Sequence, residues 1–321
     1  STNSSIGLIY ALKKIFIKIN IINYEMKKKF FLHLGYPRTG TKTFQTHFFP
    51  NHPEINYLGR HPKNKDLGLA HIDILNTIMI VSDEIFKINK SFIINEIKKL
   101  PFSENKINIV SSEFFILSEC LYDGITTTDN KKILKKTWFE RKKNTYKKSN
   151  ISLERTILRL KIICDELQIE LKVFFSIREQ SSEILSLYTA SSPEGGSSFP
   201  MPANLFLETI KKREDNDFIG VFLNTFNYFK KYEVISEIIG EKNLKVLVYE
   251  DLKYKKNYFL KELSNFLEVD FDISLDLINK SVHENSTNYL INENKKFNSI
   301  YKVILAKLIK NLSKPGQNFN I

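Results

Sequence analysis

The residues best placed to do chemistry in this chain lie between residues 30 and 45. An apolar strand is expected to end at Gly35, a turn to run up to Gly40, and a helix to begin directly after it. The unpaired N–H groups at a helix start and the positive end of the helix dipole attract anions, and Arg38 and Lys42 add full charges beside them. The stretch therefore predicts a cradle for a phosphate group.

This cradle departs from the loop that binds nucleotide triphosphates, whose pattern is G-x-x-x-x-G-K-[ST]. Gly35 and Gly40 have the required separation, but Thr41 stands where that pattern has lysine, and Lys42 arrives one residue late. One step along a helix turns a side chain by about 100°. Lys42 is therefore not aimed at a β- or γ-phosphate, and the cation inside the loop is Arg38. We expect a cradle that is not built for a metal-bound triphosphate.

Two further polar side chains follow predicted strands. The apolar run 107–110 leads to Glu113, and the run 171–177 leads to Arg178. Ligands of open parallel sheets bind outside the carboxyl ends of the strands, so the cradle and these two side chains should converge on one crevice. Ser186 comes eight residues after Arg178, about two helical turns into the next helix. Arg178 and Ser186 are expected to bind one more phosphate from two sides.

The elements that must position these residues alternate between helix and strand. Helical spacing is found in the segments 71–100, 152–167, 181–190 and 218–240, and a further strand is expected at 244–249. This alternation is typical of βαβ units, and a chain with 42% hydrophobic residues can build a large core. The predicted fold is α/β, a three-layer P-loop-like fold with a central, mostly parallel β-sheet flanked by helices.

Together these motifs resemble those of sulfotransferases that use 3′-phosphoadenosine-5′-phosphosulfate (PAPS). The run Gly-Tyr-Pro-Arg-Thr-Gly-Thr at 35–41 resembles the 5′-phosphosulfate loop of that family. Residues 177–188 resemble its 3′-phosphate motif, with the same separation between arginine and serine. Residues 246–252 and 263–267 are similar to a later strand and helix in many members. The resemblance covers about residues 28–270 and is specific because the two binding motifs occur in order.

The resemblance implies transfer of a sulfuryl group from PAPS to an acceptor hydroxyl or amine, without a metal ion. Arg38, the loop backbone and the Thr41 hydroxyl would hold the 5′-phosphosulfate, with Arg38 stabilising the charge that grows on the departing phosphate. Arg178 and Ser186 would hold the 3′-phosphate. Many members carry lysine where Arg38 stands and a second threonine where Lys42 stands. The predicted donor-binding residues are Arg38, Thr39, Gly40, Thr41, Lys42, Thr43, Arg178 and Ser186.

Glu113 is the candidate general base. It follows a strand at the edge of the predicted crevice, and sulfotransferases acting on glycans or on protein tyrosine commonly use a glutamate. The alternative is that Glu113 pairs with Arg38 and only orders the site. Histidine is the base in the small-molecule branch of the family, so His61 and His71 are also candidates. The histidines nearest the cradle are interpreted as packing or structural residues, namely His33 and His47.

The chain is predicted to form one sulfotransferase domain, residues 26–321, with a lysine-rich helical insertion at about 120–150. Residues 1–25 form a basic amphipathic segment, which fits a peripheral membrane contact, a helix packed on the domain, or sequence upstream of a natural start at Met26. No apolar run reaches the roughly 18 residues of a membrane span. The two cysteines suit a reducing compartment, so we expect a cytoplasmic protein.

The net charge of +12 fits a polyanionic ligand, although the abundance of Lys, Asn and Ile explains it equally well as a compositional bias. The basic 120–150 segment and a glutamate base favour a carbohydrate or glycoconjugate acceptor. One rival function is a nucleotide kinase or NTPase, disfavoured by the displaced Lys42. The other is a non-enzymatic module that binds nucleic acid or an anionic membrane through residues 1–25 and 131–148, although no nucleic-acid partner is expected.

Overall fold

The structure of the chain is a computed structural model, which describes residues 28–59, 75, 78–79, 81–113, 115–116, 152–191 and 224–281. Several expectations lie outside these residues. They are the amphipathic segment 1–25, the lysine-rich segment 120–150, and the alternative bases His61 and His71.

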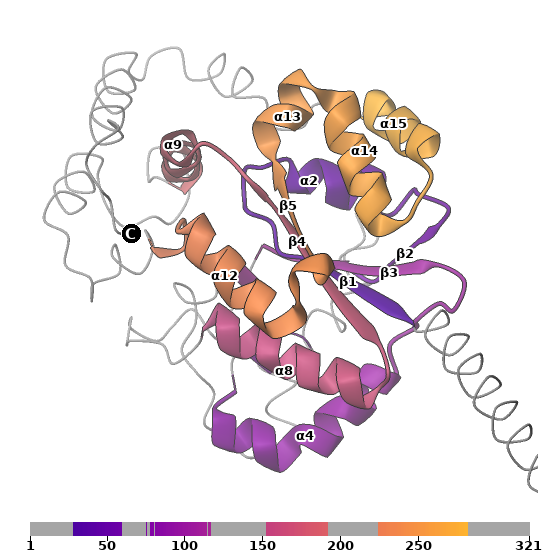
Figure 1. Cartoon of the computed structure of the whole chain (residues 1–321), viewed down its shortest axis with the longest axis vertical. Helices are drawn as coiled ribbons and strands as arrows, with labels where there is room; N and C mark the ends of the chain where they lie inside the picture. The colour runs from indigo at the N-terminus through magenta and orange to yellow at the C-terminus, as the bar shows by residue number, and fades with distance from the viewer. Residues whose placement is uncertain are drawn as a thin grey trace, which may run out of the picture.

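A five-stranded sheet lies at the centre of the molecule, and every strand in it pairs with its neighbours in parallel (Figure 1). The strand order is β2-β3-β1-β4-β5, so β1 occupies the middle. The strands are β1 (Lys29–His33), β2 (Ile55–Tyr57), β3 (Ile107–Ser111), β4 (Glu170–Ile177) and β5 (Leu244–Val248).

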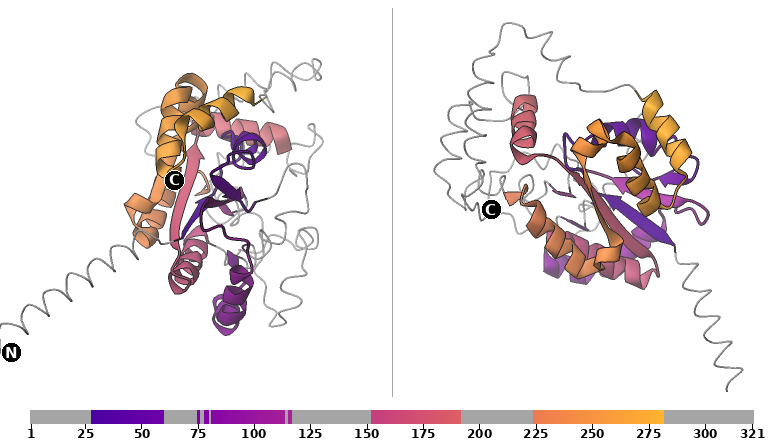
Figure 2. Two further views of the ribbon diagram at one scale, coloured as in Figure 1. Left: turned by 90° about the vertical axis from the view of Figure 1, so that its right-hand side faces the viewer. Right: turned by 45° about the horizontal axis from the view of Figure 1, so that its top comes forward.

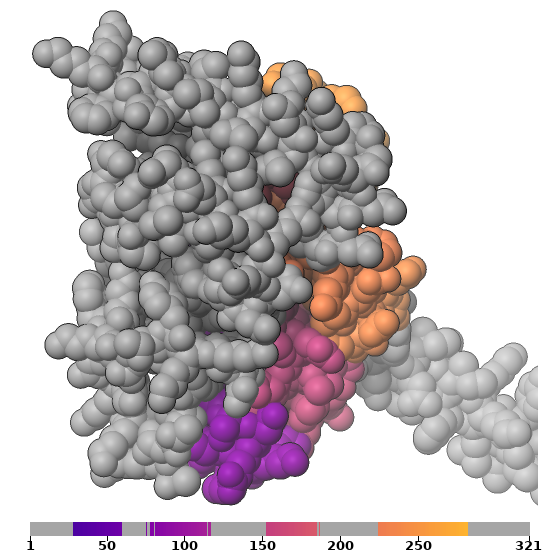
Figure 3. All heavy atoms as spheres, turned by 90° about the vertical axis from the view of Figure 1, so that its left-hand side faces the viewer, coloured from indigo at the N-terminus to yellow at the C-terminus, as the bar shows by residue number. Residues whose placement is uncertain are grey.

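Helices cover both faces of this sheet, which is seen nearly edge-on between them in Figure 2. One face carries α4 (Asp83–Lys98), α8 (Leu153–Glu166) and α12 (Tyr228–Ile239). Figure 3 views the molecule from another side and shows their atoms next to one another, in purple, pink and orange. The other face carries α14 (Lys256–Leu267), α15 (Phe271–Lys280) and the short α2 (Thr41–Thr43), which continues into a π-helical turn, η1 (Phe44–Phe48). Three further elements are α9 (Gln180–Ser191), the 3₁₀ turn η3 (Glu241–Asn243) and α13 (Tyr249–Tyr254).

The strands are apolar on both faces because each face meets a helical layer. On β1, Phe30 and Leu32 pack into the core shared with α4, α8 and α12, whereas Phe31 between them packs into the core shared with α14 and α15. On β4, Phe175 packs into the first of these cores and Phe174 into the second. Side chains alternate along a strand, so a strand buried on both faces reads as a continuous apolar run. The predicted three-layer α/β architecture is confirmed.

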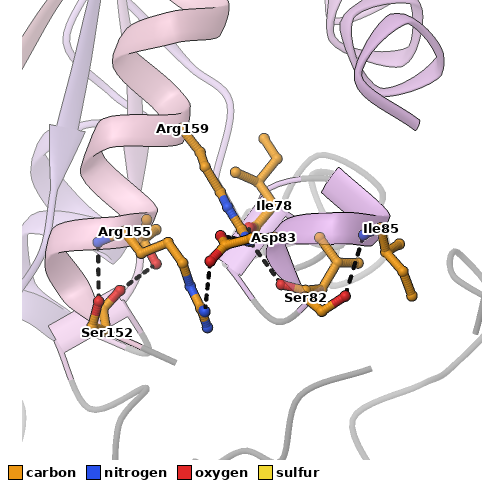
Figure 4. A network of polar contacts seen from close by, with 9 residues as sticks. Ile78, Ser82, Asp83, Ile85, Ser152, Arg155 and Arg159 are labelled. Carbon is orange, nitrogen blue, oxygen red and sulfur yellow. Dashed lines mark hydrogen bonds and ion pairs between the residues drawn. The ribbon is translucent and has the colours of Figure 1, made fainter. Parts of the chain in front are cut away.

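Polar contacts attach the start of α4 to α8 (Figure 4). Arg159 of α8 is 2% exposed, and its Nη1 atom donates to the carbonyl oxygens of Ile78 and Val81, each at 2.8 Å. Its Nη2 atom donates to Asp83 at the start of α4. The Ser82 hydroxyl caps α4 by accepting the N–H of Ile85 at 3.2 Å. This guanidinium is therefore a structural group that satisfies buried carbonyls.

The described elements agree with most of the predicted ones and differ at their ends. Within the helix expected over 71–100, α4 begins at Asp83. Within the helix expected near 218–240, α12 begins at Tyr228. Strand β2 was not predicted, because three residues are too few to show a periodicity. No helix within the described ranges is long and apolar enough to cross a membrane.

Candidate active site

The carboxyl ends of three adjacent strands bring the predicted site residues together. Strands β3, β1 and β4 are neighbours, and they lead to Glu113, to the loop that carries Arg38, and to Arg178. Arg178 donates from Nη1 to the main-chain oxygen of Arg38 at 3.2 Å. The charge of Arg38 acts on Glu113, and that of Arg178 acts on Arg38. The predicted convergence of the three strand ends is therefore present in the described residues.

The loop after β1 first follows β4 and then turns sharply. Leu34 donates its N–H to the Phe174 oxygen at 3.0 Å, and the Gly35 oxygen accepts the N–H of Ser176 at 2.8 Å. Gly35 has a φ of 98°, and a Cβ there would lie 3.3 Å from Cγ of Glu113. A side chain at this position would thus be strained and would crowd the carboxylate. This close approach fixes the loop beside Glu113.

The two threonine hydroxyls of the loop point inward. Thr39 and Thr41 are each 1% exposed, and both donate from Oγ1 to the main-chain oxygen of Tyr36, at 2.5 and 2.7 Å. They hold the turn closed from within, so the outer surface of the loop is formed by its main chain and by Arg38. Arg38 itself has a φ of 67°, an uncommon left-handed conformation for a residue other than glycine.

The guanidinium of Arg38 has an incomplete set of hydrogen bonds. Its Nε atom is buried and has no hydrogen-bond partner. Burial lowers the pKa of Arg38, with the negative charge of Glu113 opposing that shift and the positive charge of Arg178 adding to it. A partly buried guanidinium with an unpaired donor beside a second guanidinium is an arrangement that an anion stabilises.

Glu113 is partly buried, and that burial raises the pKa of its carboxyl, with the charge of Arg38 opposing the shift. A carboxylate whose pKa is raised is a stronger base than an exposed glutamate, and it still sits next to a cation that favours its ionised form. The charges of Glu113 and Arg38 therefore interact, and the role of Glu113 as the general base stays a prediction.

Three other predicted donor-binding residues lie further out. Lys42 is exposed and Thr43 is half-buried, both in α2. Ser186 is half-buried in α9, and its hydroxyl makes no hydrogen bond with the Arg178 guanidinium in the described structure. The Arg178 guanidinium instead stacks over the Tyr249 ring, 5.1 Å from its centroid. Tyr249 was not predicted as a site residue, because its contact with Arg178 joins residues far apart in sequence.

His33 has structural surroundings, as interpreted from the sequence. It is 1% exposed, its Nδ1 atom lies 2.7 Å from the Ser111 hydroxyl oxygen, and its ring stacks on Phe174 with centroids 4.7 Å apart. Burial lowers the pKa of His33 to about 3. His47 lies in the π-helical turn η1.

A second buried carboxyl group belongs to the site and was not predicted. Glu183 of α9 is 0% exposed, and its Oε2 atom lies 2.5 Å from the Tyr228 hydroxyl oxygen. The same hydroxyl lies 2.9 Å from the main-chain oxygen of Arg178. The one signal of Glu183 in the sequence is a glutamate about one turn into the helix that follows Arg178. Its partner Tyr228 is 45 residues away and belongs to a different helix.

No protein-family model matches the chain, and no curated protein matches its sequence. Three of the solved structures to which the chain is similar are each 13% identical to it. One is a sulfotransferase from Alicyclobacillus acidocaldarius, with a TM-score of 0.44 over 88% of this chain and 96% of that one. The second is the sulfotransferase domain from the Synechococcus PCC 7002 olefin synthase, with a TM-score of 0.36 over 90% of this chain and 96% of that one. The third is the sulfotransferase domain from the curacin biosynthetic pathway, with a TM-score of 0.34 over 89% of this chain and 98% of that one.

Proposed function

We propose that the protein is a PAPS-dependent sulfotransferase. The observation that carries this proposal is the buried, unpaired Nε atom of Arg38, in a loop whose main chain is in turn contacted by the guanidinium of Arg178. PAPS has two anionic parts, a 5′-phosphosulfate and a 3′-phosphate, and two guanidinium groups at one crevice suit such a ligand.

The residues present fit this donor in the following way. Arg38 and the main chain of residues 39–41 would hold the 5′-phosphosulfate, with Lys42 and Thr43 at the periphery. Arg178 and Ser186 would hold the 3′-phosphate. Thr41 already donates its hydroxyl hydrogen to Tyr36, so it would have to turn away from that carbonyl before it could donate to the ligand.

PAPS supplies an activated sulfuryl group when bound. In the transfer, a bond forms between the acceptor oxygen or nitrogen and sulfur, and the bond from sulfur to the bridging oxygen of the 5′-phosphate breaks. The Glu113 carboxylate takes the acceptor's proton, and Arg38 stabilises the negative charge that grows on the bridging oxygen. The products are the sulfated acceptor and 3′-phosphoadenosine 5′-phosphate. No metal ion takes part in this scheme.

The acceptor is proposed to be a hydroxyl group of a carbohydrate or glycoconjugate. A glutamate base and the positive charge of the chain support this choice. The expected cytoplasmic location, and contact of residues 1–25 with an anionic membrane surface, belong to the same proposal.

Transfer of radiolabelled sulfate from PAPS to a panel of glycan, phenol and amine acceptors tests the function. We expect labelled product with the wild-type chain and with Glu166→Gln, which changes an exposed carboxylate of α8. We expect none with Glu113→Gln. If no acceptor class is labelled and no PAPS-derived nucleotide binds, the proposed function is wrong.

A further inference from the structure

The buried Glu183 carboxyl is connected to Arg178 through one hydroxyl group. The Tyr228 hydroxyl oxygen lies 2.5 Å from Oε2 of Glu183 and 2.9 Å from the main-chain oxygen of Arg178. Tyr228 is held in turn by an edge-on contact with Tyr36 of the phosphate loop, with ring centroids 5.0 Å apart. The other oxygen of Glu183, Oε1, is buried and has no hydrogen-bond partner.

The number of hydrogens available around the Tyr228 hydroxyl indicates that Glu183 is protonated. A main-chain oxygen can only accept, and a tyrosine hydroxyl has one hydrogen to donate. If Glu183 were ionised, both neighbours of that hydroxyl would be acceptors, and one of the two short contacts would have no hydrogen. Both contacts are hydrogen bonds only if Tyr228 donates to Arg178 and Glu183 donates from Oε2 to Tyr228.

We infer that Glu183 is a positioning residue which, in its protonated form, fixes the main chain of Arg178 through Tyr228 and so sets that guanidinium for the 3′-phosphate of the nucleotide. The inference rests on the proposed function for its ligand, and on the contacts above for its mechanism. Glu183 touches neither donor nor acceptor in this account.

The surroundings favour a proton on Glu183 at neutral pH. Burial raises the pKa of Glu183 to about 8, against the opposing effects of the hydrogen bond with Tyr228 and of the Arg178 charge. Two carboxylates on other elements add to the rise, Glu250 at the start of α13 and Glu113 after β3. Burial and the neighbouring Glu183 raise the pKa of Tyr228, so Tyr228 keeps its hydrogen throughout this range.

Ionisation of Glu183 would break the link. The Tyr228 hydrogen would then be drawn to the carboxylate, the Arg178 oxygen would lose its partner, and a new anion would stand beside the guanidinium that binds the 3′-phosphate. The 3′-phosphate gains nothing from the change, because its own second ionisation, near pH 6, is complete below this range. Affinity for the 3′-phosphorylated nucleotide should therefore fall as the pH rises through about 8.

Calorimetric titration with 3′-phosphoadenosine 5′-phosphate from about pH 6.5 to about pH 9.5 tests this pH dependence. We expect the wild-type affinity to fall about tenfold across the range, and adenosine 5′-phosphosulfate, which lacks the 3′-phosphate, to show less than half of that change. Glu183→Gln can still donate to Tyr228 from its amide nitrogen but cannot ionise. This variant should bind the nucleotide as tightly as the wild type does near pH 6.5, and its affinity should not fall as the pH rises.

Two further variants complete the test. Tyr228→Phe removes the bridging hydroxyl and should weaken binding at every pH, whereas Glu237→Gln, on the same helix α12, should behave as the wild type. The inference is wrong if Glu183→Gln keeps the wild-type pH slope, or if Tyr228→Phe binds normally.

A measurement without nucleotide separates this inference from the proposed function. The folded-state pKa of Glu183 lies above the ordinary value of 4.5, so its contribution to stability is complete below about pH 4.5 and is lost as the pH rises to about 8. The melting temperature of the wild type should fall relative to Glu183→Gln over that window. An infrared difference spectrum between the two at about pH 6.5 should contain the carbonyl band of a protonated carboxyl. If both signals appear but no nucleotide binds, the function is wrong and the protonated link stands; if nucleotide binds but both signals are missing, the link is wrong.

Discussion

Arg38 and Glu113 are each held in their charged form by the other. Burial lowers the pKa of Arg38 and raises that of Glu113, and in each case the charge of the partner opposes the shift. A general base works best when its pKa lies near the working pH. In the proposed reaction, partial burial of Glu113 would therefore favour proton abstraction, while the charge of Arg38 limits how far its pKa rises.

Glu113→Gln should abolish sulfuryl transfer and leave nucleotide binding nearly intact, because the amide cannot take the acceptor's proton. In the wild type, kcat/KM should rise with pH as Glu113 loses its proton, with a midpoint above the ordinary glutamate value of 4.5. Rate measurements across the acid range, with calorimetry for binding, check both statements. Retained turnover in Glu113→Gln would move the base to another residue.

Arg178→Ala should weaken binding of 3′-phosphoadenosine 5′-phosphate by about 2–4 kcal/mol, the range for losing one partner of a buried charge-assisted contact. Adenosine 5′-phosphosulfate should lose much less, because it has no 3′-phosphate. Calorimetry with the two nucleotides makes the comparison, and Arg155→Ala, on α8, serves as the matched control for loss of one positive charge. A uniform loss for both nucleotides would contradict the assignment of Arg178.

The elements that carry these residues could be predicted because the parallel sheet is buried on both faces. The runs that became β1, β3 and β4 are mostly apolar, with Asn108 inside β3 and Lys172 and Ser176 inside β4, and polar residues follow them, which is the pattern of such strands. The sequence therefore located Glu113 and Arg178 at strand ends. It could not order the strands as β3-β1-β4, which is what makes those ends adjacent.

Contacts between distant elements were not predictable. The link from Glu183 through Tyr228 to Arg178 depends on how α12 packs near the end of β4, and no local spacing records that packing. The inward turn of the Thr39 and Thr41 hydroxyls was missed for a related reason. Both hydroxyls donate to a main-chain oxygen, and because every residue has one, the residue types do not show which oxygen accepts.

The α4–α8 contact offers a test at the level of elements. Arg159→Met should destabilise the fold by roughly 2–4 kcal/mol, because it leaves the buried carbonyls of Ile78 and Val81 without a donor. Lys161→Met on the same helix breaks only a surface pair with Asp165 and should cost less than about 1 kcal/mol. Urea unfolding measures both, and a loss for Arg159→Met no larger than that for Lys161→Met would contradict the structural role. Nucleotide affinity should be unchanged in both variants.

At the scale of the whole molecule, the candidate site residues lie together at one end of the sheet. The two helical layers bury the faces of the sheet, and the carboxyl ends of its three central strands are where Glu113, Arg38 and Arg178 meet. The position of Lys42, one residue beyond that of a triphosphate loop, agrees with a donor that needs loop cations but no magnesium-bound γ-phosphate.

Calorimetric titration of the wild-type chain tests the identity of the donor most directly. We expect tight binding of 3′-phosphoadenosine 5′-phosphate that is the same with and without Mg²⁺, and no binding of ATP under either condition. Magnesium-dependent binding of ATP, with no response to the 3′-phosphorylated nucleotide, would contradict it.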